Sequence, residues 1–286
     1  MSRVLESAFE AVVLSLLGEM DFAGLAGDRF DPDRSGAAGS AGVLREEPWG
    51  YGSGKSALAE RESYHMAMLA QRLRAAVGRI NPGLPAEAVD AAVHAVIDVG
   101  FTELGPENRR IHALLVGGVP VEYQRGGETI HDRARLVDWQ DEQNEWLAVN
   151  QFTVVGANKR RTDILIFLNG LPLVVMELKG TESKNADIVS AYNQIQTYKA
   201  DIPALFRTNL MSVLSDGFAA RYGTLSADFD RHMAWRTVDG DALVDPKSLV
   251  AWETLVRGLL RREVLLPQLL SGALRVANAG LFPEYV

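Results

Sequence analysis

Two carboxylates and one ammonium group bracket the most apolar part of the sequence. Asp163 stands immediately before the apolar run 164–168, and Glu177 and Lys179 close the next run, 171–176. Because Glu177 and Lys179 are two residues apart, a strand would turn both side chains to the same face of a sheet. Two carboxylates that converge at a strand end suit Mg²⁺, a metal that can orient and polarise a phosphodiester, and a neighbouring lysine can stabilise the charge that develops. The triplet therefore predicts phosphodiester hydrolysis, against a salt-bridged strand end, which is the commoner role of such residues.

The turn between the two apolar runs decides whether this site can exist. The dipeptide Asn169-Gly170 is a strong signal for a β-hairpin. A strict two-residue loop would pair Leu168 with Leu171 and place Asp163 and Glu177 on opposite faces of the sheet. We therefore expect either a loop with an odd number of residues or a β-bulge, since each would bring the two carboxylates to one face.

The remaining pattern predicts an α/β fold. Both faces of the two central runs are apolar, as in a sheet that is covered by helices on both sides. The Gly-, Ser- and Pro-rich stretch 23–57 predicts a long mobile loop. Apolar periodicity predicts helices near 4–17, 58–77, 86–99 and 188–198 and a helical tail from 246, with strands near 119–123, 146–155, 164–168, 171–176 and 211–214.

Composition narrows the choice of function. The chain has 286 residues, 47% of them hydrophobic and none of them cysteine, which excludes disulfide frameworks and cysteine-based zinc sites. No run reaches the ~18 apolar residues that span a bilayer, and no signal-peptide pattern begins the chain. Because the net charge is −8, nucleic acid would have to be bound by a local basic patch. Lys159, Arg160 and Arg161, next to Asp163, supply such a patch.

One further motif is a decoy. Residues 50–56 (GYGSGKS) are similar to a phosphate-binding loop, but the first glycine of that motif would have to stand at Trp49. No apolar strand precedes the segment either. We therefore expect a loop without nucleotide binding at this place.

The chemistry-bearing residues match a known motif. Thr162-Asp163, the apolar hairpin and Glu177-Leu178-Lys179 resemble the PD-(D/E)xK nuclease motif, with threonine in place of the usual proline. Within that superfamily one group carries a helix with the pattern QxxxY, and Gln194 and Tyr198 are similar to it. These two residues lie one helical turn apart and therefore on one face.

Segments outside the motif resemble the N-terminal part of the R subunit of type I restriction enzymes. The resemblance covers roughly 60–245, with a weaker match in the first helix. Its most specific segments are 108–110 (NRR), 118–123 (GVPVEY), 148–154 (AVNQFTV), 169–172 (NGLP), 198–203 (YKADIP), 215–217 (SDG) and 235–237 (WRT).

The resemblance implies a restriction-endonuclease-like fold, with a central mixed sheet flanked by helices, and roles for individual residues. Asp163 and Glu177 would hold Mg²⁺, and Lys179 would assist the attack on the phosphodiester. Gln194 and Tyr198 would line the same site. Glu10, on the first helix, matches an acidic position that sometimes contributes to the metal site.

The resemblance also implies a biological setting. The expected activity is Mg²⁺-dependent cleavage of unmodified double-stranded foreign DNA in the cytoplasm, together with modification and specificity subunits. Family chains are several times longer, so we expect a nuclease domain over 1–245, a helical tail over 246–286 and an ATP-dependent motor outside this chain. Two alternatives stay open: another QxxxY-type DNA repair nuclease, and a truncated, non-catalytic module that docks on partner subunits.

Overall fold

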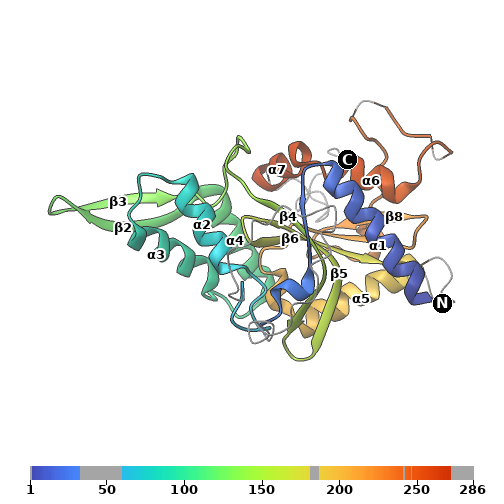
Figure 1. Cartoon of the computed structure of the whole chain (residues 1–286), viewed down its shortest axis with the longest axis horizontal. Coiled ribbons are helices and arrows are strands. Elements are labelled where there is room, and N and C mark those ends of the chain that lie inside the picture. Colours follow the sequence, from blue (N-terminus) through green and yellow to red (C-terminus); the bar gives the residue numbers. More distant parts are fainter. Residues whose placement is uncertain (1, 33–59, 181–186, 241, 246, 272–286) are drawn as a thin grey trace, which may run out of the picture.

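A six-stranded mixed sheet forms the centre of the protein, which we describe from a computed structural model over residues 2–32, 60–180, 187–240, 242–245 and 247–271 (Figure 1). The strand order is β1-β4-β5-β6-β7-β8. β1 is parallel to β4 and β6 to β7, whereas the other neighbours are antiparallel. The strands are β1 (Ala23–Ala26), β4 (Trp146–Val155), β5 (Lys159–Leu168), β6 (Leu171–Leu178), β7 (Met211–Ser215) and β8 (Ala220–Gly223).

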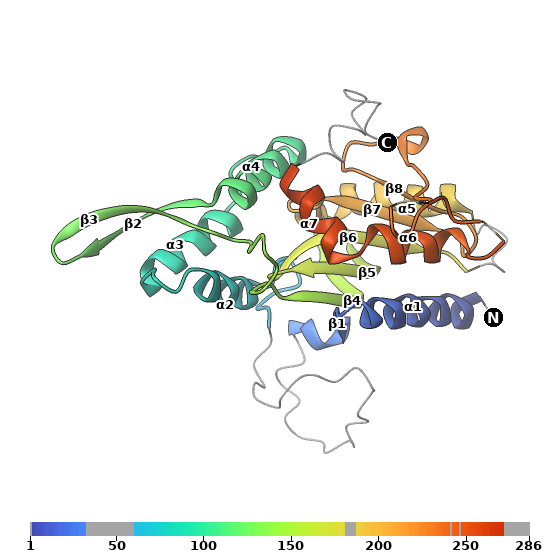
Figure 2. The ribbon, with the colours of Figure 1, turned by 90° about the horizontal axis from the view of Figure 1, so that it is seen from above.

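Helices cover both faces of this sheet, so the predicted α/β architecture is confirmed and is consistent with a restriction-endonuclease-like fold. α5 (Ile188–Asp201) and the short η3 (Pro203–Phe206) contribute to the core on one face. α1 (Ser2–Glu19), α6 (Ala251–Leu259) and α7 (Arg262–Ser271) contribute to the core on the other face (Figure 2). No helix in the described ranges is both long enough and apolar enough to cross a membrane.

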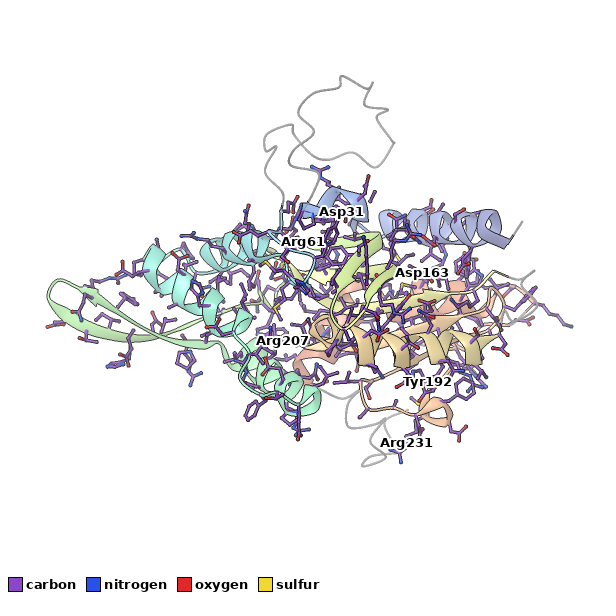
Figure 3. The ribbon with its side chains drawn as sticks, turned by 90° about the horizontal axis from the view of Figure 1, so that it is seen from below. Asp31, Arg61, Asp163, Tyr192, Arg207 and Arg231 are labelled. Atoms are coloured by element: carbon purple, nitrogen blue, oxygen red, sulfur yellow. The ribbon has the colours of Figure 1, made fainter. Side chains whose placement is uncertain are left out.

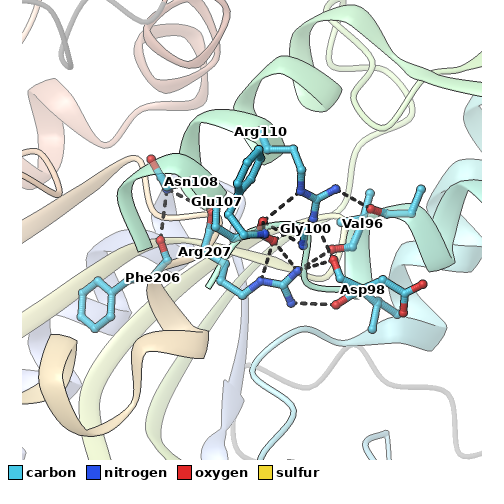
Figure 4. A network of polar contacts seen from close by, with 11 residues as sticks. Val96, Asp98, Gly100, Glu107, Asn108, Arg110, Phe206 and Arg207 are labelled. Atoms are coloured by element: carbon cyan, nitrogen blue, oxygen red, sulfur yellow. Dashed lines mark hydrogen bonds and ion pairs between the residues drawn. The ribbon is translucent and has the colours of Figure 1, made fainter. Parts of the chain in front are cut away.

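A second group of elements projects from one end of the sheet. It consists of α2 (Ala70–Ile80), α3 (Ala86–Ile97), α4 (Leu104–Gly117) and a long hairpin of β2 (Val119–Arg125) and β3 (Glu128–Ala134) (Figure 1). Glu107 at the start of α4 joins this group to the sheet region, because it bonds both Arg110 and Arg207 (Figure 4). Arg207 also donates to backbone carbonyls at the end of α3.

The β5–β6 hairpin resolves the parity question raised by the sequence. Leu168 pairs with Leu171, so the loop has two residues, and Gly170 takes the positive φ of 81° that such a turn requires. The register then shifts between Ile166 and Phe167, which is a β-bulge. The expectation of an odd loop or a bulge is confirmed in its second form, because one extra residue in β6 reverses the parity of every position beyond it.

The predicted loop over 23–57 is wrong at its beginning. Ala23–Ala26 is an edge strand, and the short helix η1 (Gly27–Phe30) follows it and buries Phe30 completely. A Cβ at Gly27 would clash with the carbonyl oxygen of Asn150, so only glycine allows this close approach to β4. The strand was missed because four residues with one large apolar side chain, Leu25, are too short to show a hydrophobic period. The rest of that loop, including the decoy at 50–56, lies outside the described residues.

Two helices also differ from the sequence pattern. α4 was not predicted, and α2 begins at Ala70 and not at 58. The segment before α2 is held in a non-helical path by Arg61, whose buried guanidinium donates to the carbonyl oxygen of Phe30 at 2.7 Å. Arg61 also lies 3.7 Å from the carboxylate of Asp31 (Figure 3). Tertiary contacts thus overrode the local helical pattern.

Candidate active site

Asp163 and Glu177 lie on the same face of the sheet, close to each other. The pair Ile164–Met176 places Asp163 opposite Glu177 in the adjacent strand. Asp163 is 8% exposed and Glu177 is 1% exposed. The backbone amide of Leu178 donates to Oδ2 of Asp163 at 2.7 Å, which fixes the carboxylate against the end of β6. The bulge in β6 therefore creates the juxtaposition that the chemistry needs.

Lys179 completes the predicted triplet. Its ammonium forms an ion pair with Oε1 of Glu177 and lies 3.8 Å from Oε1 of Glu6 on α1. Its backbone amide donates to the carbonyl oxygen of Ser215 at 2.8 Å, so β7 holds the end of β6 in place. The position of the lysine is thus set by three different elements.

Burial and neighbouring charges shift the pKa values of the three residues at this end of the sheet. Burial, followed by the charge of Glu177, raises the pKa of Asp163 well above its ordinary value. Burial also raises the pKa of Glu177, although the ammonium of Lys179 opposes this change. Burial favours the neutral form of Lys179, but the adjacent carboxylates outweigh it and raise its pKa, so the side chain is charged. Two buried carboxylates that repel each other would gain from a cation placed between them.

α5 brings the predicted glutamine and tyrosine to the same site. The helix begins after Asp187, whose side chain accepts a hydrogen bond from the amide of Ser190 at 2.6 Å. The hydroxyl of Tyr198 donates to the carbonyl oxygen of Arg161 at 3.0 Å. Burial raises the pKa of Tyr198, and the charges of Glu177 and Asp163 raise it further. The hydroxyl of Tyr198 therefore lies near the carboxylate pair, and the roles of Gln194 and Tyr198 in the site stay predictions.

Glu10 approaches the pair from α1. It is 4% exposed, and Nε2 of Gln151 donates to its two carboxylate oxygens at 2.7 and 2.8 Å. Gln151 has a φ of 54°, a left-handed conformation in the middle of β4 that is unusual for a residue with a side chain. The charge of Glu10 adds to the rise in the pKa of Asp163. Its role as a metal ligand stays a prediction.

Sequence reasoning missed Gln151 and Glu6 as members of the site. Glu6 stands one helical turn before Glu10, which is a signal that was visible in the sequence. Gln151 had no such signal, because its contact with Glu10 spans 141 positions along the chain. Only the pairing of α1 with β4 brings these side chains together.

The basic run lies at the start of β5, beside the site. Lys159 is exposed, with its ammonium 4.9 Å from the ring centre of Tyr64. Arg160 forms an ion pair with Asp201 at the end of α5. Arg161 is exposed and has no ion-pair partner in the part of the chain that the structure describes. Lys159 and Arg161 thus have no ion-pair partner within 4 Å among the described residues, although the positive charge of Arg161 acts to lower the pKa of Glu10.

The donor set fits a divalent cation with few protein ligands. Oε2 of Glu177 is buried and has no hydrogen-bond partner among the described residues, so it is an orphaned oxygen. No group of three or more His, Cys, Asp or Glu side chains in the described ranges is arranged to hold a metal. Mg²⁺ needs only one or two carboxylates, because it keeps several waters. Asp163 and Glu177 would hold it.

Comparisons with known proteins identify the family of this chain. A family model described as "Type I restriction enzyme R protein N terminus" matches residues 44–231, about two thirds of the chain. The chain belongs to this family. The matched residues 44–231 include every element that carries the candidate site except α1.

Individual relatives carry the same family name. The chain is 43% identical over 172 residues to the type I restriction enzyme HindI endonuclease subunit of Haemophilus influenzae, over 59% of this chain and 16% of the relative. It is 32% identical over 187 residues to the putative type I restriction enzyme MjaIXP endonuclease subunit of Methanocaldococcus jannaschii, over 64% of this chain and 18% of the relative. It is 33% identical over 117 residues to the EcoprrI endonuclease subunit of Escherichia coli, over 38% of this chain and 36% of the relative. The aligned part of this chain therefore spans well under half the length of each of these relatives.

Proposed function

We propose that this chain is the Mg²⁺-dependent endonuclease module of a type I restriction R subunit and hydrolyses phosphodiester bonds of double-stranded DNA. One observation carries the proposal: a bulged hairpin places two buried carboxylates and an ammonium at one end of the sheet. The family match and the names of the relatives support the same activity.

Each residue of the site has a distinct task in this proposal. Asp163 and Glu177 would hold the cation, and a bound Mg²⁺ would supply polarisation of the phosphodiester and a lower pKa for the attacking water. Lys179 stabilises the negative charge that develops on the phosphoryl oxygens. Gln194 and Tyr198 keep the carboxylate pair in position from α5, while Lys159, Arg160 and Arg161 contact the DNA backbone, with Arg160 shared with Asp201.

The wider setting is also a proposal. Since the relatives are named endonuclease subunits, we infer that the chain acts with modification and specificity subunits on unmodified foreign DNA in the cytoplasm. ATP would be used by a motor that accompanies this module. The described residues contain the candidate cleavage site, and DNA-sequence recognition is assigned to the specificity subunit.

The direct test combines cleavage with metal binding. The 286-residue chain is incubated with plasmid DNA and Mg²⁺ or Mn²⁺, and nicking is measured on gels while Mn²⁺ binding is followed by electron paramagnetic resonance. We expect Lys179→Ala to lower nicking by roughly 100- to 1,000-fold and to retain Mn²⁺. We expect Asp163→Asn and Glu177→Gln to lose both, because each removes one of the two proposed ligands.

The matched control is Lys247→Ala, which removes an exposed lysine remote in sequence from the site. It should nick DNA as the unchanged chain does. The proposal is wrong if the unchanged chain neither binds Mn²⁺ nor nicks DNA, alone or assembled with its partner subunits. It is also wrong if the Lys179 variant cleaves as fast as the control.

A further inference from the structure

A large aromatic side chain stands exposed at the turn between β7 and β8. Phe218 is 69% exposed, whereas five of the nine phenylalanines in the described ranges, Phe152 and Phe167 among them, are buried. A phenylalanine this exposed gains little from folding, because its ring stays in water. Its position therefore calls for an explanation other than core packing.

The turn that carries Phe218 is rigid. The carboxylate of Asp216 accepts hydrogen bonds from the amides of Phe218 and Ala219 at 3.0 and 2.8 Å. The hydroxyl of Ser215 donates to the carbonyl oxygen of Ala219 at 2.8 Å and accepts from the amide of Gly217 at 3.2 Å. Gly217 has a φ of 89°. The hydrogen bonds of the segment Ser215-Asp216-Gly217 thus fix the turn, and the turn holds the side chain of Phe218 in solvent at one place.

This turn lies at the end of the sheet where the candidate site is. Ser215 pairs with Leu178, and its carbonyl oxygen accepts the amide of Lys179 at 2.8 Å. Since β6 and β7 are parallel, their carboxyl ends leave the sheet together. Lys159 and Arg161 lie at the same end, on the other side of Glu177 in the strand order. The end of β6, with Glu177, therefore lies between β5, which begins with the basic run, and β7, which leads into the turn that carries Phe218.

We propose that Phe218 is a DNA-contacting wedge that packs against a base step next to the phosphodiester to be cut. This inference rests on the proposed nuclease function and adds a residue to it. Apolar side chains inserted between base steps unstack them and kink the duplex, and aromatic rings stack on bases of any sequence. A wedge of this kind would fix the duplex while remaining indifferent to its sequence, as a module without its own recognition site requires.

DNA fits this place better than a protein partner does. A protein interface would need apolar neighbours around the ring, but the next residues on either side are Gly217 and Ala219, and Asp216 is engaged in the turn itself. The turn follows β7, the strand next to β6 with its Glu177, and the basic run at the start of β5 lies at the same end of the sheet. A lone exposed ring at the end that carries the candidate cleavage site matches a duplex, because its bases offer a stacking face at any sequence.

The test separates this inference from the proposed function. Binding of the 286-residue chain to duplex DNA that contains 2-aminopurine is measured in EDTA, so that cleavage cannot contribute. We expect the unchanged chain to raise 2-aminopurine fluorescence by unstacking the probe. Phe218→Ala should bind about 10-fold more weakly and without the rise in fluorescence, and Phe218→Trp should restore both. In Mg²⁺, Phe218→Ala should raise the KM for DNA more than it lowers kcat.

Phe101→Ala is the matched control, because Phe101 is 51% exposed in the loop between α3 and α4. It should behave as the unchanged chain does, and all variants should unfold at the same temperature. If the unchanged chain binds DNA and Phe218→Ala binds equally well, the wedge is refuted and the nuclease stands. If Phe218→Ala weakens only assembly with partner subunits, the ring is a protein contact and the inference is refuted as well. If the unchanged chain binds no DNA, either alone or assembled with its partner subunits, the proposed function fails and the wedge fails with it.

Discussion

The buried carboxylates of this protein show two opposite electrostatic situations. Burial raises the pKa values of Asp163 and Glu177, and the charge of Glu177 raises that of Asp163 further, so burial disfavours their ionised forms in the folded protein. Burial also acts to raise the pKa of Glu107, but hydrogen bonds from Arg110 and Arg207 outweigh it and lower that pKa to about 2. The first arrangement is costly for stability and useful for holding a cation, whereas the second stabilises the fold.

The Glu107 network predicts a specific dependence of stability on pH. Because the pKa of Glu107 falls from 4.5 to about 2 on folding, its contribution is present above pH 4.5 and is lost as the pH falls towards 2. A shift of this size corresponds to about 3 kcal/mol. We therefore expect Glu107→Gln to lower the free energy of unfolding by roughly that amount at pH 7, and by progressively less below pH 4.5.

Urea unfolding at a series of pH values measures this difference. Glu87→Gln, which changes an exposed acid on α3, should leave the free energy of unfolding within about 0.5 kcal/mol of the unchanged chain. A destabilisation by Glu107→Gln that is the same at pH 3 and pH 7 would show that the carboxylate charge is not responsible.

At the scale of elements, the β4–β5 hairpin is the part that presents positive charge next to the site. Its turn is docked on the end of α5, where the amide of Ala157 donates to the carbonyl oxygen of Asp201 at 2.8 Å. The side chains of Asn158 and Arg160 bond the carboxylate of the same residue. The hairpin is therefore held rigidly, and its other two cations, Lys159 and Arg161, face outward.

Charge reversal in this hairpin should weaken DNA binding without altering which DNA sequences are preferred. For Lys159→Glu combined with Arg161→Glu we expect weaker affinity for every duplex sequence, because contacts to phosphates carry no sequence information. The slope of log affinity against log salt concentration should fall by roughly one for each phosphate that the variant no longer neutralises. Lys247→Glu is the control for a charge reversal elsewhere on the surface. Weaker binding confined to one DNA sequence would contradict this assignment.

At the scale of the whole molecule, the C-terminal helices belong to the core of the sheet region. α6 packs on α1 and β8, and Trp252 meets the ring of Phe9 with centroids 5.1 Å apart. Seven apolar side chains between 251 and 271 are buried; they are Leu255, Val256, Leu259, Leu260, Leu265, Leu266 and Leu269. These side chains lie beyond residue 245, where the sequence pattern placed the end of the nuclease domain.

Truncation measures how much the domain depends on these helices. A chain that ends at 245 loses seven buried side chains worth roughly 1.5–3 kcal/mol each, which is comparable to the whole stability of a typical domain, about 5–15 kcal/mol. We expect it to lose its cooperative thermal transition in calorimetry. A chain that ends at Ser271 keeps every described element and is the control. Cooperative unfolding of the shorter chain at an unchanged temperature would instead support a boundary near 245.

The sequence by itself determined the sheet's central hairpin and the three charged residues at its end. Apolar runs interrupted by Asp163, Glu177 and Lys179 can be read locally, because alternation along a strand has a period of two. The same holds for α5, whose cap Asp187 and apolar spacing fix the place of Gln194 and Tyr198. These features depend on neighbours only a few residues away.

Only the tertiary structure decided how the hairpin's two carboxylates meet and what surrounds them. The bulge in β6 depends on the packing of the sheet. The amino-acid sequence alone does not distinguish this bulge from a three-residue loop. The edge strand Ala23–Ala26, the bond between Glu10 and Gln151 and the bond between Lys179 and Ser215 each join segments far apart in the chain. Such contacts depend on the register between distant strands, which no local pattern of residues encodes.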